Sequence, residues 1–125
     1  MLLKDKYFEV KHEEHLNANE AVYLCRLKTD CDVYRGHFPG KPVSPGVCNI
    51  EMIRECAEML TGQDLRIDTI KQCRLTAVAS PSICPEVDVR VTVARIEGTD
   101  QYNIIATIAD AERSYMELKG LLVIC

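Results

Sequence analysis

Between residues 46 and 61, apolar residues recur at steps of three and four. That period is typical of an amphipathic helix with one buried side. Ser44 can cap the helix, Pro45 fits its first position, and Gly62 fits the residue just past its end. The pattern therefore predicts a helix between Pro45 and Gly62. Its apolar side carries Ile50, Ile53, Ala57 and Leu60, widened by Met52, Cys56 and Met59, and its opposite side carries Glu51, Arg54, Glu55 and Glu58.

Beyond Gly62 the hydrophobic period changes to two, which predicts strands with one buried face. Residues 86–96 and 101–110 alternate in this way, and residues 98–100 between them (Gly-Thr-Asp) predict a hairpin turn. Residues 67–78 and 113–125 predict two further strands, and residues 21–29 predict one before the helix. The order of strand, long helix and four strands indicates an α+β fold in which an antiparallel sheet curls around one helix.

The chain has 125 residues and no internal repeat, low-complexity tract or linker, so we expect one domain over residues 1–125. No apolar run approaches the length that crosses a membrane, and we expect no membrane partner. Residues 1–6 (MLLKDK) are too short and too charged for a secretory signal. These features predict a cytoplasmic protein.

Charge and cysteine spacing argue against several classes of function. The net charge is −4, and the sequence shows no basic stripe that could bind phosphates. Nucleic acid is therefore not an expected partner. Residues 11–15 (KHEEH) differ from the HExxH zinc motif in spacing, and a solvated charged segment is the favoured interpretation. The seven cysteines form no CxxC pair. We expect them to be reduced, and we expect no metal site.

One segment carries most of the functional information. Residues 37–51 read HFPGKPVSPGVCNIE, with three prolines and two glycines between a histidine and a glutamate. The segment resembles the HFPGxPxxPGVxxxE motif of the β-hydroxyacyl-[acyl-carrier-protein] dehydratases, which are hotdog-fold enzymes of fatty-acid synthesis. Nine positions match without a gap, and the separation of His37 and Glu51 also matches. The resemblance implies a hotdog fold, with a curved antiparallel sheet wrapped around one long central helix.

The resemblance also implies a mechanism and an assembly. His37 would remove the C2 proton of a (3R)-hydroxyacyl thioester, and Glu51 would protonate the departing hydroxyl to yield a trans-2-enoyl thioester and water. The backbone N–H of Gly46 would hold the thioester carbonyl, and Phe38 and Val47 would contact the substrate. The resemblance implies no metal and no organic cofactor. It also implies a substrate that is carried on the phosphopantetheine of an acyl carrier protein. In the family, each site of a homodimer takes its histidine from one subunit and its acid from the other. The resemblance leaves open whether the dimers form a larger oligomer.

The residue types suit these roles. A proton next to a thioester is weakly acidic, so its removal needs a base and a group that stabilises the enolate. A glycine in the first helical turn offers an N–H without an intrahelical partner at the positive end of the helix dipole. Histidine titrates near neutral pH, whereas Glu51 would need a raised pKa to act as an acid. Arg35 and Lys41 flank the motif and are candidates for contacts with an acidic carrier protein.

The segment also departs from the family pattern. Ser44, Cys48 and Asn49 stand where aliphatic residues are usual, which predicts a differently shaped tunnel. Glu55 stands where glutamine is common, and a second carboxylate one turn away would raise the pKa of Glu51. These differences leave both housekeeping fatty-acid synthesis and a specialised lipid or polyene pathway open. A hotdog acyl thioesterase and a non-catalytic acyl-binding partner subunit are the alternative functions. The acyl chain length and the preference for carrier protein or coenzyme A also stay open.

Overall fold

The computed structural model describes residues 1–36 and 44–125. These residues form one antiparallel six-stranded sheet with the order β1-β2-β4-β5-β6-β3. The strands are β1 (Phe8–Asn17), β2 (Glu20–Leu27), β3 (Leu65–Leu75), β4 (Glu86–Arg95), β5 (Gln101–Ala109) and β6 (Ser114–Ile124). A short 3-10 helix, η1 (Asp32–Arg35), and the long helix α1 (Gly46–Thr61) lie between β2 and β3.

The central strands follow the alternation in the sequence. Val87, Val89, Val91 and Val93 of β4 are all buried, as are Ile104, Ala106 and Ile108 of β5. Their register places Val89 opposite Ile108 and Val91 opposite Ala106, so the two buried rows meet on one face. Gly98 in the connecting turn has φ +77°, a conformation that glycine adopts without strain. The predicted hairpin is therefore confirmed.

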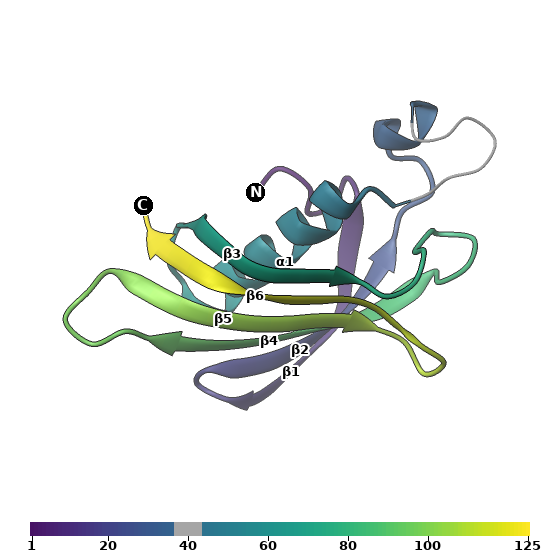
Figure 1. Ribbon diagram of the computed structural model, residues 1–125. Coiled ribbons are helices and arrows are strands. Elements are labelled where there is room, and N and C mark those ends of the chain that lie inside the picture. Colours follow the sequence, from purple (N-terminus) through teal and green to yellow (C-terminus); the bar gives the residue numbers. More distant parts are fainter. Residues whose placement is uncertain (37–43) are drawn as a thin grey trace.

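Helix α1 lies along the inner face of the curved sheet and carries the chain from β2 to the far edge strand β3 (Figure 1). Its buried residues include Met52, Ile53, Cys56 and Ala57. It ends where predicted, because Gly62 adopts the left-handed conformation with φ +70° and its N–H donates to the carbonyl of Glu58. The expected hotdog architecture is confirmed. No helix among the described residues has the length and apolar character needed to span a bilayer.

The sequence pattern missed one strand. Residues 8–17 form the edge strand β1, which pairs with β2 along its length, so two strands precede the helix instead of one. The KHEEH segment belongs to this strand and is exposed, as the solvated interpretation predicted. Because an exposed edge strand needs no alternating buried row, its sequence shows little of the strand period.

The opposite edge strand, β3, is also uncovered. Only Leu65 of this strand is buried, and every residue from 68 to 75 is exposed. Two irregularities in its pairing with β6 bend the strand. Gly120 of β6 fits there because any Cβ would collide with the carbonyl of Thr69. Thus β3 leaves exposed apolar residues, among them Ile70 and Leu75, and Leu75 lies beside the start of α1.

Candidate active site

The start of α1 presents backbone donors. Gly46 is the first helical residue, and the carbonyl of Pro45 accepts from the N–H groups of Cys48 and Asn49 at 3.0 and 3.1 Å. The N–H groups of Gly46 and Val47 therefore have no acceptor within the helix, and the helix dipole makes this end positive. An oxygen that gains negative charge is stabilised in such a position.

The prediction that Ser44 caps this helix is wrong, and Pro45 precedes the first helical residue instead of occupying it. Ser44 is buried, and its backbone N–H donates to the carbonyl of Ala79 at 2.8 Å. Its hydroxyl lies 3.3 Å from the hydroxyl of Tyr34 in η1. These tertiary contacts direct Ser44 away from the cap, and proline at position 45 has no capping side chain.

A cavity of about 430 Å³ opens beside the helix start. Ser44, Gly46 and Asn49 line one wall, and residues 75–79, at and after the end of β3, line the other with mostly apolar side chains. A Cβ added to Gly46 would lie 3.6 Å from a methyl carbon of Leu75. The glycine thus keeps the cavity wide where its N–H is presented. A cavity of this size is within the range that holds an acyl group or similar small ligand.

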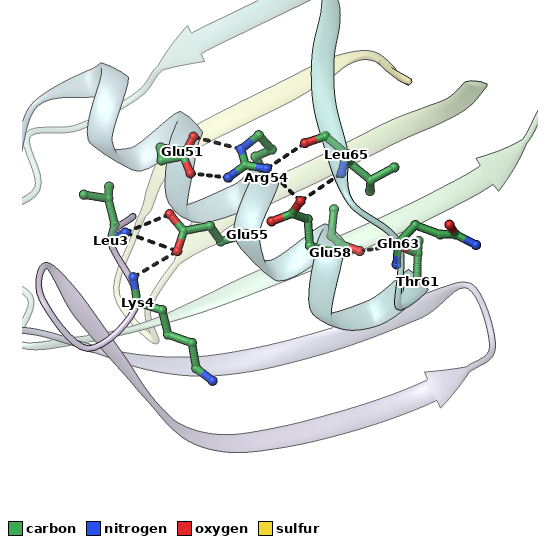
Figure 2. A network of polar contacts seen from close by, with 10 residues as sticks. Leu3, Lys4, Glu51, Arg54, Glu55, Glu58, Thr61, Gln63 and Leu65 are labelled. Atoms are coloured by element: carbon green, nitrogen blue, oxygen red, sulfur yellow. Dashed lines mark hydrogen bonds and ion pairs between the residues drawn. The ribbon is translucent and has the colours of Figure 1, made fainter. Parts of the chain in front are cut away.

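A second side of α1, one turn further on, carries the predicted acid. The guanidinium of Arg54 binds the Glu51 carboxylate with two hydrogen bonds of 2.8 and 2.6 Å. The same guanidinium contacts the Glu58 carboxylate at 2.9 Å and donates to the carbonyl of Leu65 at 2.6 Å (Figure 2). Partial burial opposes ionisation of Glu51, but the hydrogen bonds and the charge of Arg54 outweigh it. The pKa of Glu51 therefore lies below its ordinary value.

The polar side of the helix is not exposed to solvent: Glu51, Arg54 and Glu58 are partly buried, and Glu55 is fully buried. Its carboxyl accepts from the backbone N–H of Lys4 at 2.9 Å and of Leu3 at 3.1 and 3.3 Å (Figure 2). Burial, together with the neighbouring Glu51 carboxylate, raises the pKa of Glu55 to about 7, although the two backbone donors lower it. The N-terminal segment that covers Glu55 is the reason that the sequence pattern misplaced it.

The raised pKa that the sequence predicted for Glu51 is thus found on Glu55, and the prediction for Glu51 is wrong. Arg54 explains the difference, because it compensates the charge of Glu51 and Glu58 and makes no hydrogen bond to Glu55. Glu51 and Glu55 interact with each other, so their protons are properties of the pair. This pair binds one proton more tightly than an isolated glutamate would.

The structure separates the predicted residues within one chain. Glu51 lines a second, apolar cavity of about 360 Å³ with Val47, Ile50 and Ile67, whereas Gly46 lines the first. Val47 is 72% exposed. Arg35 is exposed in η1, with its guanidinium 3.4 Å from the Asp32 carboxylate. The remaining predicted residues, His37, Phe38 and Lys41, lie outside the described residues.

Sequence reasoning missed the contact between Tyr7 and Asn49, which lies in the wall of the first cavity. The hydroxyl of Tyr7 donates to the Asn49 amide oxygen at 2.8 Å, and both residues are buried. Asn49 stood out as polar within an expected aliphatic stretch, but no sequence signal linked it to Tyr7, which lies 42 residues away.

Comparisons with known proteins agree with this architecture. Residues 11–116 match the ApeI-like family, described as ApeI dehydratase. A 3-hydroxyacyl-[acyl-carrier-protein] dehydratase FabZ from Rhizorhabdus wittichii is 26% identical, over 88% of this chain and 81% of that protein. The dehydratase heterocomplex ApeI:P from Xenorhabdus doucetiae contains a chain that superposes with a TM-score of 0.68 at 20% identity, over 92% of this chain and 96% of that one.

A hypothetical thioesterase with coenzyme A from Streptococcus pneumoniae superposes with a TM-score of 0.67 at 7% identity, over 94% of this chain and 85% of that one. A dehydratase and a hypothetical thioesterase thus share the fold, and the fold alone does not select the reaction. The family match extends over most of the sheet and the whole of α1. The chain belongs to the ApeI-like dehydratase family.

Proposed function

We propose that this protein dehydrates (3R)-hydroxyacyl thioesters on an acyl carrier protein to trans-2-enoyl thioesters. The observation that carries the proposal is the family match over residues 11–116, which includes the HFPG segment and the helix start with its cavity. Fatty-acid synthesis and a specialised lipid or polyene pathway both use this reaction. We propose that the protein acts in the cytoplasm.

The proposed reaction uses groups of the protein alone, without a metal or an organic cofactor. His37 takes the proton from C2, and the electron pair moves toward the thioester carbonyl, whose oxygen accepts from the Gly46 N–H. The bond between C3 and its hydroxyl then breaks, and the hydroxyl leaves as water with a proton from Glu51. Phe38 and Val47 contact the acyl group. The exposed position of Val47 beside the cavity at Glu51 supports this role.

The acid must hold a proton before it can donate one, yet Arg54 favours the ionised form of Glu51. The neighbouring Glu55 offers a solution. Because the pKa of Glu55 is raised to about 7, the pair of carboxyls retains one proton at mildly acid to neutral pH. In our proposal, Glu55 supplies this proton to Glu51 when Glu51 protonates the leaving hydroxyl, and the pair takes up a proton from solvent afterwards.

The site requires a homodimer in this proposal. Within one chain Gly46 and Glu51 line different cavities, so the acid beside a given Gly46 comes from the partner subunit. The uncovered strand β3 and the exposed apolar side chains near it, including Leu75 and Val78, offer a surface for the second copy. Arg35, exposed in η1, and Lys41 would contact the acidic carrier protein.

The test is incubation of the purified protein with 3-hydroxyacyl carrier proteins of several chain lengths, with the products measured by mass. Loss of water from the acyl group is the expected result. Release of free carrier thiol without an enoyl product would show a thioesterase instead. If the protein binds the acyl carrier protein but turns over nothing, the proposed activity of this chain alone is wrong and a partner subunit is required.

A further inference from the structure

The side chain of Asn49 forms part of the wall of the 430 Å³ cavity at the helix start. Asn49 is only 4% exposed, so its amide is almost entirely removed from bulk solvent. It lies three residues after Gly46, and residues at this spacing share one side of a helix. The Gly46 backbone and the Asn49 amide therefore face the same space.

Tyr7 determines how this amide is oriented. Its hydroxyl donates to Asn49 Oδ1 at 2.8 Å, so the amide oxygen points toward the N-terminal segment and the amide nitrogen points away from it. Tyr7 is itself fully buried, and its ring stacks on that of Tyr34 with centroids 6.2 Å apart. A rotation of the amide by half a turn would place the donor Nδ2 against the Tyr7 hydroxyl, which would then have to accept the hydrogen bond instead of donating it.

The Asn49 amide nitrogen makes no hydrogen bond within residues 1–36 and 44–125. A donor in the wall of a cavity marks a place where an acceptor oxygen of a ligand is expected. The facing wall, formed by residues 75–79, is mostly apolar. The cavity thus fits a ligand with an apolar body and one acceptor oxygen close to Gly46, and an acyl thioester has this chemistry.

We propose that Asn49 Nδ2 donates a second hydrogen bond to the thioester carbonyl oxygen held by the Gly46 N–H, and that Tyr7 keeps the amide in this orientation. This inference rests on the proposed function and adds a side-chain donor to the backbone donor. Asn49 is then a catalytic residue, because it contacts the oxygen that becomes negative when C2 loses its proton. Tyr7 is a positioning residue.

Two donors stabilise the developing charge better than one. Removal of one donor from such a site typically lowers kcat about 10²- to 10³-fold. The substitution Asn49→Asp keeps the size of the side chain and the acceptor for Tyr7 but removes the donor. The substitution Asn49→Leu removes both and restores an aliphatic side chain. Asn103→Asp is the matched control, because it makes the same chemical change at an exposed position of β5 that does not line the cavity.

The experiment measures dehydration, and also the affinity for two unreactive ligands on the same carrier protein: a saturated acyl thioester and the thioether that lacks the carbonyl oxygen. We expect Asn49→Asp and Asn49→Leu each to lower kcat about 10²-fold and to weaken binding of the thioester only. Tyr7→Phe should lower kcat about tenfold with the same selectivity for the thioester. Asn103→Asp should leave both affinities close to those of the wild type.

Equal weakening of thioester and thioether binding by both Asn49 variants would show that Asn49 only shapes the cavity, and the inference would be wrong. Unchanged thioester binding in both variants would overturn it as well. Because binding is measured without turnover, failure of the wild type to dehydrate any substrate would refute the proposed reaction and leave this result interpretable. Circular dichroism identifies a variant that does not fold, and the other Asn49 variant then decides.

Discussion

Two sides of the same helix differ in how their polar groups are satisfied. The cavity side, Gly46 and Asn49, presents donors to a space of about 430 Å³. The carboxylate side, Glu51, Arg54, Glu55 and Glu58, consists of groups bound to one another and to backbone atoms of Leu3, Lys4 and Leu65 (Figure 2). The donors on the first side face open space, whereas the polar groups on the second side are satisfied mainly by other groups of the protein.

This difference suits one helix to two tasks in the proposed reaction. Donors at a helix start keep their positions because the backbone holds them, so they can wait for a ligand without reorganisation. Carboxylates in the middle of the helix have no such support, and Arg54 and the N-terminal segment hold them instead. In the proposed reaction, the first side binds charge as it develops, and the second stores a proton.

The largest effect should come from removing the proposed base and the proposed acid, each in a different chain. His37→Ala and Glu51→Gln should each lower dehydration about 10²- to 10⁴-fold, because each removes a general base or acid. If the two sides act together across a dimer, refolding the variants together should restore about one-quarter of wild-type activity, since about half of the dimers are mixed and each has one intact site. Activity assays with and without mixing provide the measurement. No recovery despite demonstrated subunit exchange would contradict the shared site.

A stability effect should follow from truncation of the buried carboxyl. Glu55→Ala leaves the N–H groups of Leu3 and Lys4 without their acceptor and leaves a void beneath the N-terminal segment. We expect the free energy of unfolding to fall by about 2–4 kcal/mol, measured by urea denaturation. Glu14→Ala in the exposed strand β1 is the control and should change it by less than about 0.5 kcal/mol. Similar losses in both variants would show that burial of Glu55 does not matter.

The pH dependence of stability isolates the proton of the pair. The pKa of Glu55 is raised from 4.5 to about 7, so the folded chain binds more protons than the unfolded chain between these values. The free energy of unfolding should therefore decrease as pH rises from about 4.5 to about 7. The lowered pKa of Glu51 acts in the opposite sense and below pH 4.5. Glu55→Gln should remove the decrease, as followed by urea denaturation at several pH values, and an unchanged curve would refute the assignment of the proton.

The same substitution should change the rate profile. In the wild type, dehydration should decline as pH rises through about 7, because the pair loses its remaining proton. In Glu55→Gln this decline should move to lower pH, since Glu51 alone has a lowered pKa. The measurement is kcat against pH for both proteins. Coincident profiles would mean that Glu55 supplies no proton to the reaction.

The smallest effect should come from the flanking charge, which belongs to neither side of the helix. Arg35 is 86% exposed, and reversal of an exposed charge changes association with a charged partner only a few-fold. Arg35→Glu should raise KM for an acyl carrier protein substrate by about this factor and leave KM for the same acyl group on coenzyme A unchanged. Lys119→Glu, exposed on β6, is the control. Equal changes for both carriers would exclude a contact between Arg35 and the carrier protein.

Much of the fold could be predicted because the relevant signals are local. The alternation of Val87 to Val93, the left-handed Gly62 and the turn at Gly98 each reflect the conformational preference of a short segment. The HFPG segment and the spacing from His37 to Glu51 could be recognised because they lie within one short stretch of the sequence. Strand β1 was not predicted, since an exposed edge strand shows no row of buried residues.

The candidate site was only half visible in the sequence. The sequence by itself determined the helix, its end at Gly62 and the residue types at the site, because these depend on backbone preference and on chemical identity. Tertiary structure alone decided that Ser44 turns to Tyr34, that Tyr7 orients Asn49, and that Leu3 and Lys4 cover Glu55. Those contacts join residues 10 to 52 positions apart. Burial and hydrogen bonding across such separations set the pKa of a carboxyl, and a periodic pattern along the helix does not contain them.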